Sequence, residues 1–167
     1  MKWLAGLLHF IEASMVHLKN ILLTTDLSPH SRNAIPYAVS LVGQYGGRLS
    51  LLHVEANVTP LMMPLPTGEL VGFSGAGKLD RSREEHAALM ALSEEIERDW
   101  KIQVEPLVRF GDAAAEIAAC AREIGADCIV ASSHGRTGLA HMVLGSTAER
   151  IVRLAPCAVL IVRPGAK

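Results

Sequence analysis

Short apolar runs alternate along the chain with segments in which apolar residues recur every three or four positions. The first pattern predicts buried β-strands and the second predicts amphipathic helices. The predicted strands cover the ranges 20–25, 49–54, 102–108, 126–131 and 158–162. The predicted helices cover 29–45, 80–100, 113–124 and 146–154. This order predicts a three-layer α/β/α fold, in which helices cover both faces of a five-stranded parallel sheet.

Residues that favour helix ends flank these segments. Ser28 suits the N-cap of the first helix, and Pro29 suits its first position, where a missing N–H costs no hydrogen bond. Asp112 is the predicted N-cap of the third helix. Ser146 and Glu149 have the spacing of a capping box, so Ser146 is the predicted cap of the fourth helix.

Residues 1–18 do not fit the alternating pattern. Their apolar residues recur at roughly helical spacing, so we expect an N-terminal extension that forms an amphipathic helix, followed by one domain over 19–167. The extension is too short to span a membrane. A signal peptide is not expected, because only one Lys precedes the apolar stretch, His9 interrupts it and no clear small-residue cleavage site follows. Met15 is an alternative natural start, in which case residues 1–14 are an upstream extension.

Residues 56–78 are rich in Pro, Gly and Met, and we expect a mobile connection there. Gly72, Gly77 and Lys78 have the spacing of a phosphate-binding P-loop. That motif needs a Ser or Thr after the Lys, but the next residue is Leu79. No apolar strand precedes the glycines either, so the segment is interpreted as a linker.

The composition of the chain indicates a globular domain and argues against some classes of function. The chain has 167 residues, of which 50% are hydrophobic and 20% charged, as in a globular domain. Its formal net charge is −1 and aromatic residues make up 4%, which argues against nucleic-acid binding. The three cysteines are widely spaced within apolar patterns, and they are interpreted as reduced thiols of a cytoplasmic protein. None pairs with histidines at metal-ligand spacing, so no metal site is expected.

Small and hydroxyl-bearing residues follow the fourth predicted strand and begin the fourth helix. The first group is 132–138, Ser-Ser-His-Gly-Arg-Thr-Gly, and the second is 145–147, Gly-Ser-Thr. Backbone N–H groups and a helix N-terminus in such a setting bind anions, so these segments predict the phosphate half of a nucleotide site. Asp26 directly follows the first strand. If the first and fourth strands are neighbours in the sheet, Asp26 faces this site.

These segments resemble the universal stress protein family. The nucleotide signature of that family is Gly-x2-Gly-x9-Gly-(Ser/Thr). Gly135 and Gly145-Ser146 match its second and third glycines at the right spacing, whereas Ser132 occupies the first glycine position. Thr25-Asp26-Leu27-Ser28 and the apolar run 156–162 also resemble the family, and the resemblance covers about residues 18–164.

The resemblance implies a Rossmann-like sheet of the adenine-nucleotide-hydrolase type, with strand order 3-2-1-4-5. It further implies a homodimer that pairs through the fifth strand, Cys157 to Arg163, and a site for ATP or a related adenine nucleotide, with or without Mg²⁺. Carried over by position, Asp26 holds the adenosine end and Leu49 lines the adenine pocket. The remaining implied contacts, to ribose and phosphates, are Ser132, Gly135, Gly145, Ser146 and Thr147. Arg136 adds a charge-assisted contact to a phosphate.

Three functions stay open from the sequence. The favoured one is an ATP-binding dimeric sensor or regulator of the stress response, acting on an unidentified partner. The second is a nucleotide-free interaction protein of the same fold, since the side chain of Ser132 replaces a glycine where backbone meets ligand. The third is slow ATP hydrolysis, for which the sequence offers no evident base and no paired carboxylates.

Overall fold

We describe the fold from a computed structural model, which describes residues 16–56, 61–64, 67, 70–73, 76–133 and 144–163. The expected helix in the N-terminal extension lies outside these ranges, and the division near residue 18 stays a prediction. Among the described residues, no helix has both the length and the apolar character needed to cross a membrane.

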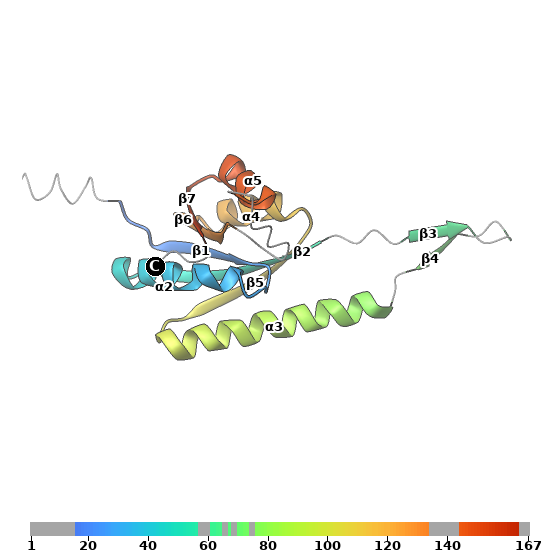
Figure 1. Cartoon of the computed structure of the whole chain (residues 1–167), viewed down its shortest axis with the longest axis horizontal. Helices are drawn as coiled ribbons and strands as arrows, with labels where there is room; N and C mark the ends of the chain where they lie inside the picture. Colours follow the sequence, from blue (N-terminus) through green and yellow to red (C-terminus); the bar gives the residue numbers. More distant parts are fainter. Residues whose placement is uncertain are drawn as a thin grey trace, which may run out of the picture.

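A parallel sheet of five strands forms the centre of the molecule, in the order β5-β2-β1-β6-β7 (Figure 1). Its strands are β1 (Asn20–Thr25), β2 (Arg48–Glu55), β5 (Val104–Phe110), β6 (Cys128–Ser132) and β7 (Ala158–Val162). When the five strands of this sheet are numbered 1 to 5 in chain order, their spatial order is 3-2-1-4-5, as expected. The strand order reverses between β1 and β6, where polypeptide crosses from one half of the sheet to the other.

Helices cover both faces of the sheet, as Figure 1 shows. On one face, α2 (Ile35–Tyr45) and α3 (Ala76–Trp100) pack in a core that contains Ile21 and Leu51. On the other, α4 (Ala113–Glu123) and α5 (Ser146–Leu154) pack in a core that contains Leu22 and Leu52. Neighbouring residues of β1 and β2 thus enter opposite cores, because successive side chains of a strand point to opposite faces. The three-layer α/β/α prediction is confirmed.

The first helix begins later than predicted. The segment after β1 forms a 3-10 turn, η1 (Ser31–Ala34), before α2 starts at Ile35. Ser28 still accepts a hydrogen bond at its Oγ from Ser31 N, 3.3 Å away, but Ser31 begins this turn, whose N-cap is His30, so Ser28 does not cap the α-helix. Pro36, and not Pro29, lies in the first turn of α2, where a missing N–H is tolerated.

The capping box predicted at α5 is not formed. Gly145 is the N-cap, and no side chain makes a capping hydrogen bond there. Glu149 instead donates its backbone N–H to the Gly145 carbonyl, and its carboxylate pairs with Arg153 at 2.9 Å. Ser146 is therefore the first helical residue, and its hydroxyl is not used as a cap. The N-cap predicted at Asp112 is confirmed, because its carboxylate accepts from Ala115 N at 3.0 Å.

The segment 56–78 is not only a connection. It contains an antiparallel pair, β3 (Leu61–Pro64) and β4 (Leu70–Phe73), in a two-stranded sheet separate from the main one (Figure 1). Helix α3 starts at Ala76, four residues before the predicted start. Gly72 of the P-loop look-alike thus lies in β4, whereas Gly77 and Lys78 lie in α3, and β4 pairs antiparallel outside the central sheet. This is not the strand-loop-helix arrangement of a P-loop.

Candidate functional site

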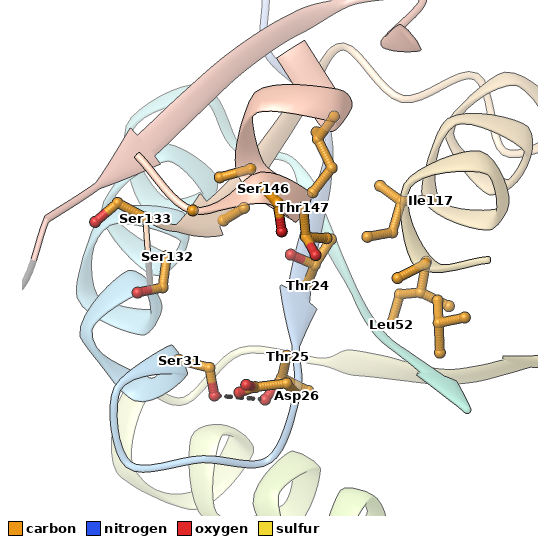
Figure 2. Close-up of a pocket in the computed structure, with 16 residues that line it drawn as sticks. Thr24, Thr25, Asp26, Ser31, Leu52, Ile117, Ser132, Ser133, Ser146 and Thr147 are labelled. Atoms are coloured by element: carbon orange, nitrogen blue, oxygen red, sulfur yellow. Dashed lines mark hydrogen bonds between the residues drawn. The ribbon is translucent and has the colours of Figure 1, made fainter. Parts of the chain in front are cut away.

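A pocket of about 320 Å³ opens at the carboxyl ends of β1 and β6, where the strand order reverses (Figure 2). This volume falls within the range of about 300–1,000 Å³ that is usual for small-ligand sites. The described residues that line it come from β1 and its loop, β2, α4, β6 and α5. They are Thr24, Thr25, Asp26, Ser31, Leu52, Val54, Ala113, Ile117, Ala131, Ser132, Ser133, Gly145, Ser146, Thr147, Ala148 and Ile151.

The turn after β1 holds Asp26 at the pocket. Oδ1 of Asp26 accepts from Ser28 N at 3.0 Å and from Ser28 Oγ at 2.6 Å, and Leu27 adopts a left-handed backbone with φ of 64°. The hydroxyls of Thr25 and Ser31 lie 2.9 Å apart, and Thr25 Oγ1 also accepts from Leu27 N. The turn is therefore fixed by its own side chains, which orients one carboxylate at the edge of the pocket.

A short hydrogen-bonded path ties the start of α5 to the sheet. Gly145 donates its N–H to the carbonyl of Ser133 at 2.9 Å, and Ser133 donates its own N–H to the carbonyl of Val162 in β7 at 2.8 Å. The positive end of α5 is thereby held beside the ends of β6 and β7, with Ser146 and Thr147 facing the pocket in Figure 2. Free N–H groups at a helix start favour an anion.

The opposite side of the pocket is apolar. Leu52 and Val54 of β2 contribute to it together with Ile117 of α4 and Ile151 of α5. Figure 2 shows Leu52 and Ile117 on the side of the pocket away from Ser132 and Ser133. The pocket thus combines an apolar wall suited to a flat ring with hydroxyls and a helix start suited to a sugar and a phosphate.

Leu49, expected at the adenine pocket, does not line it. It is 1% exposed and packs in the core between the sheet and helices α2 and α3. Two facts of strand geometry explain the correction: Leu49 lies near the amino end of β2, and its side chain points to the opposite face from Leu52. Leu52 and Val54 of the same strand line the pocket instead.

Five of the predicted site residues meet around the pocket: Asp26, Ser132, Gly145, Ser146 and Thr147. Gly135 and Arg136 lie outside the described residues. The sequence reasoning missed the hydroxyls of Thr24, Ser31 and Ser133. Thr24 and Ser133 could have been found from their positions beside Asp26 and Ser132 at strand ends, whereas Ser31 is brought to the pocket by the 3-10 turn.

An ion pair joins the two helices that border the apolar wall. Arg150 of α5 forms two hydrogen bonds to the Asp112 carboxylate at the start of α4, at 2.7 and 2.8 Å. The guanidinium, with help from the Ala115 N–H, lowers the pKa of Asp112, and the carboxylate raises the pKa of Arg150. Both side chains are about half exposed, so water screens the pair and its contribution is mainly to fix the spacing of α4 and α5.

His53 is a buried residue that contacts the backbone of Thr25, one of the residues that line the pocket. It is 2% exposed, and its Nδ1 lies 2.9 Å from the carbonyl of Thr25, which can only accept a hydrogen bond. Nδ1 therefore carries the proton, and Nε2 lies 3.5 Å from a carboxylate oxygen of Glu85 on α3. This histidine connects β1, β2 and α3 and does not line the pocket.

The described residues contain no group of three or more His, Cys, Asp or Glu side chains placed to hold a metal ion. Asp26 is the single carboxylate among the described residues that line the pocket. One carboxylate together with ligand phosphates is enough to bind Mg²⁺. A metal here would therefore depend on the ligand for most of its coordination.

The comparison with known proteins agrees with this geometry. A family model described as the universal stress protein family matches residues 17–163. Universal stress protein YxiE of Bacillus subtilis is 33% identical over 151 residues, which is 86% of this chain and 97% of that protein. The solved structure of universal stress protein UspA from Lactobacillus plantarum superposes with a TM-score of 0.72 at 21% identity, covering 89% of this chain and all of that one.

A third match shows the same fold with a ligand. The universal stress protein from Archaeoglobus fulgidus, solved in complex with dAMP, superposes with a TM-score of 0.58 at 16% identity. The alignment covers 88% of this chain and 98% of that one. The extent of the family match and the identity to the Bacillus subtilis protein show that this chain belongs to the universal stress protein family.

Proposed function

We propose that this protein binds ATP or a related adenine nucleotide in the pocket between β1 and β6, and acts as a dimeric sensor or regulator in a stress response. The observation that carries the proposal is the division of the pocket into an apolar wall and a hydroxyl-lined side at a helix start. The dAMP complex of the Archaeoglobus fulgidus relative supports it.

The proposed placement follows from the chemistry of each wall. The adenine ring lies against Leu52, Val54 and Ile117, where its burial removes apolar area from water. The Asp26 carboxylate accepts a hydrogen bond from the adenosine end. The phosphates lie at the start of α5 near Ser146, because the N–H groups and the helix dipole favour negative charge there. Gly135 and Arg136 are also proposed to contact the phosphates, and this part of the proposal rests on the sequence motif alone.

The test is calorimetry on the full chain after bound nucleotide has been stripped by partial unfolding and refolding. ATP, ADP and AMP are titrated separately, with and without Mg²⁺. We expect saturable binding of at least one of them at micromolar to millimolar concentration. GTP is the matched control, because it presents the same phosphates with a different ring. The absence of binding by all three adenine nucleotides would contradict the proposal and favour a nucleotide-free interaction protein.

We further propose a twofold homodimer through β7. Among the described strands, β7 pairs only with β6 and so ends the sheet, and its central residues are only partly buried although they are apolar. Val152 and Leu154 of the adjoining α5 are 51% and 44% exposed. An exposed apolar edge favours association, and pairing with a second copy removes it.

Light scattering at micromolar concentration checks the dimer. We expect a mass twice that of one chain for the wild type, and a shift towards one chain for Val152→Glu combined with Leu154→Glu, because two carboxylates would be buried at the contact. Met90→Glu is the control, since Met90 is similarly exposed but lies on α3. A wild-type mass of one chain would overturn the dimer without affecting the nucleotide proposal.

The proposed location is the cytoplasm. Cys120, Cys128 and Cys157 are all free, and burial raises the pKa of each thiol. Unreactive, reduced thiols are typical of proteins in a reducing compartment.

A further inference from the structure

A buried histidine is bonded to the peptide that joins β1 to Asp26. His53 is paired in register with Thr25 of the neighbouring strand, and its ring nitrogen Nδ1 lies 2.9 Å from the Thr25 carbonyl oxygen. Both residues are shielded from water, since His53 is 2% and Thr25 9% exposed. Loss of a hydrogen bond in such a place is unfavourable, because a buried carbonyl would then have neither water nor a protein donor.

The bonded carbonyl belongs to the same rigid unit as the backbone of Asp26. The carbonyl of Thr25 and the N–H and Cα of Asp26 lie in one plane, because the peptide bond does not rotate freely. A bond to the carbonyl oxygen therefore fixes the orientation of that plane and the direction in which Asp26 leaves β1. Thr25 and Asp26 both line the pocket and lie side by side in Figure 2. His53 thus contacts the backbone that carries the pocket residues, and it does not line the pocket itself.

The turn after β1 depends on fixed anchors. Leu27 has φ of 64°, in the left-handed region that residues with a side chain rarely adopt. Two hydrogen bonds of 3.0 Å hold the turn: Thr25 Oγ1 accepts from Leu27 N, and the Asp26 carboxylate accepts from Ser28 N. Thr25 and Asp26 are the two residues joined by the peptide that His53 contacts. A turn with an unfavourable backbone conformation keeps its shape only while the surrounding structure holds it.

The other side of the histidine ring faces helix α3. Nε2 of His53 lies 3.5 Å from one carboxylate oxygen of Glu85, and the second oxygen of Glu85 pairs with Arg81 at 3.3 Å. On the strand side, β5 pairs with β2 so that Val108 lies opposite His53 in register. The ring is therefore enclosed by β1, β5 and α3, which keeps Nδ1 directed at the Thr25 carbonyl.

We propose that His53 is a positioning residue of the nucleotide site. Its Nδ1–H holds the Thr25 carbonyl, which orients the Asp26 carboxylate towards the bound adenosine and keeps the turn after β1 in the shape that binds. The role is indirect, because His53 acts through the Thr25–Asp26 peptide and does not touch the nucleotide. The inference rests on the proposed nucleotide function and adds to it a residue outside the pocket.

The experiment compares His53→Asn with His53→Leu. The two new side chains have the same size and branching and both lose the approach to Glu85, but only the Asn amide can donate a hydrogen bond. Its nitrogen is attached to Cγ, as Nδ1 is in histidine. We expect affinity for ATP and AMP to be about 3- to 10-fold lower in His53→Leu than in His53→Asn, because without this bond the turn has its binding shape only about a tenth to a third of the time.

Affinity is measured by calorimetry at a temperature where urea denaturation shows both variants fully folded. His86→Leu is the control, because His86 is an exposed residue of α3, and its replacement should leave nucleotide affinity unchanged. Equal affinity of His53→Asn and His53→Leu would overturn the inference, since the hydrogen bond to Thr25 would then have no effect on binding.

A second measurement needs no nucleotide. NMR of isotope-labelled wild type should show the proton of the neutral His53 ring on Nδ1. The amides of Leu27 and Ser28 should exchange with solvent faster in His53→Leu than in His53→Asn, because the turn opens more often. A proton on Nε2 alone, or equal exchange in the two variants, would overturn the inference. Failure of the wild type to bind any adenine nucleotide would instead overturn the proposed function, so the two failures are distinguishable.

Discussion

Replacing Gly145 with alanine is expected to weaken nucleotide binding at least about tenfold, equivalent to about 1.4 kcal/mol. A Cβ at this position would lie 2.8 Å from the carbonyl oxygen of Ser133, closer than such atoms approach in folded proteins. The same carbonyl accepts the Gly145 N–H at 2.9 Å, so it cannot retreat without loss of that hydrogen bond. The start of α5 must therefore move away from β6, and Ser146 and Thr147 move with it.

The cause is contact and not backbone strain. Gly145 has φ of −68° and ψ of 151°, an extended conformation open to any residue. Alanine is excluded because its Cβ would lie too close to the carbonyl oxygen of Ser133. Crowding of this kind costs about 1–3 kcal/mol of folding free energy. This gives a physical reason for the last glycine of the family signature in this chain: it lets the helix start lie directly on the strand end.

Chemical denaturation and calorimetry measure the two effects on Gly145→Ala. Gly43→Ala is the matched control, because a Cβ on Gly43 meets no atom within 4 Å and the residue lies inside α2. Alanine there should stabilise the protein by about 0.5–1 kcal/mol, through helix propensity, and leave binding unchanged. Wild-type affinity in Gly145→Ala would show that the contact between α5 and β6 does not position the ligand.

The strands and the layer architecture could be predicted from the sequence because each is a local pattern. The apolar run 20–25 reads as β1 with the bounds that the structure has, and the run 158–162 as β7. Gly46, which directly follows the predicted range 29–45 of the first helix, takes the left-handed backbone that favours glycine. The strand order came from the family resemblance, since no local pattern specifies which strands are neighbours.

The errors arise where a choice depends on neighbours distant in the sequence. Ser146 has the pattern of a cap, but the bond between Gly145 and the Ser133 carbonyl places the cap one residue earlier. The antiparallel pair β3–β4 was missed for a different reason: its strands are close in sequence, but they lie in a stretch whose Pro and Gly content is typical of a linker. The hydroxyl of Ser132, which is buried and has no hydrogen-bond partner among the described residues, could not be predicted either, because burial and the lack of a partner are properties of the assembled pocket.

The second large effect concerns the apolar wall. Leu52 is fully buried, packs against α4 and α5 and lies in the wall of the pocket, so Leu52→Ala removes core contacts and changes the shape of that wall. We expect a loss of about 2–5 kcal/mol in the free energy of unfolding. The truncation also leaves a void in the apolar wall, so nucleotide affinity should fall about tenfold, equivalent to about 1.4 kcal/mol.

The adjacent residue provides a control within the same strand. Leu51 is as buried as Leu52, but its side chain packs on the opposite face with α2 and α3. Leu51→Ala should lose a similar free energy of unfolding while nucleotide affinity stays near that of the wild type. Both variants are compared by urea denaturation and by calorimetry at a temperature where each is fully folded.

This pair tests the assignment of faces on which the corrected position of Leu49 depends. Leu49 and Leu51 point to one side of β2 and Leu52 to the other, so among these three residues only truncation at Leu52 changes the wall of the pocket. If Leu51→Ala lowered nucleotide affinity as much as Leu52→Ala does in fully folded protein, both losses of affinity would reflect a general loosening of the sheet. The apolar wall would then not be the ring-binding side of the pocket, and the placement of the adenine would have to be abandoned.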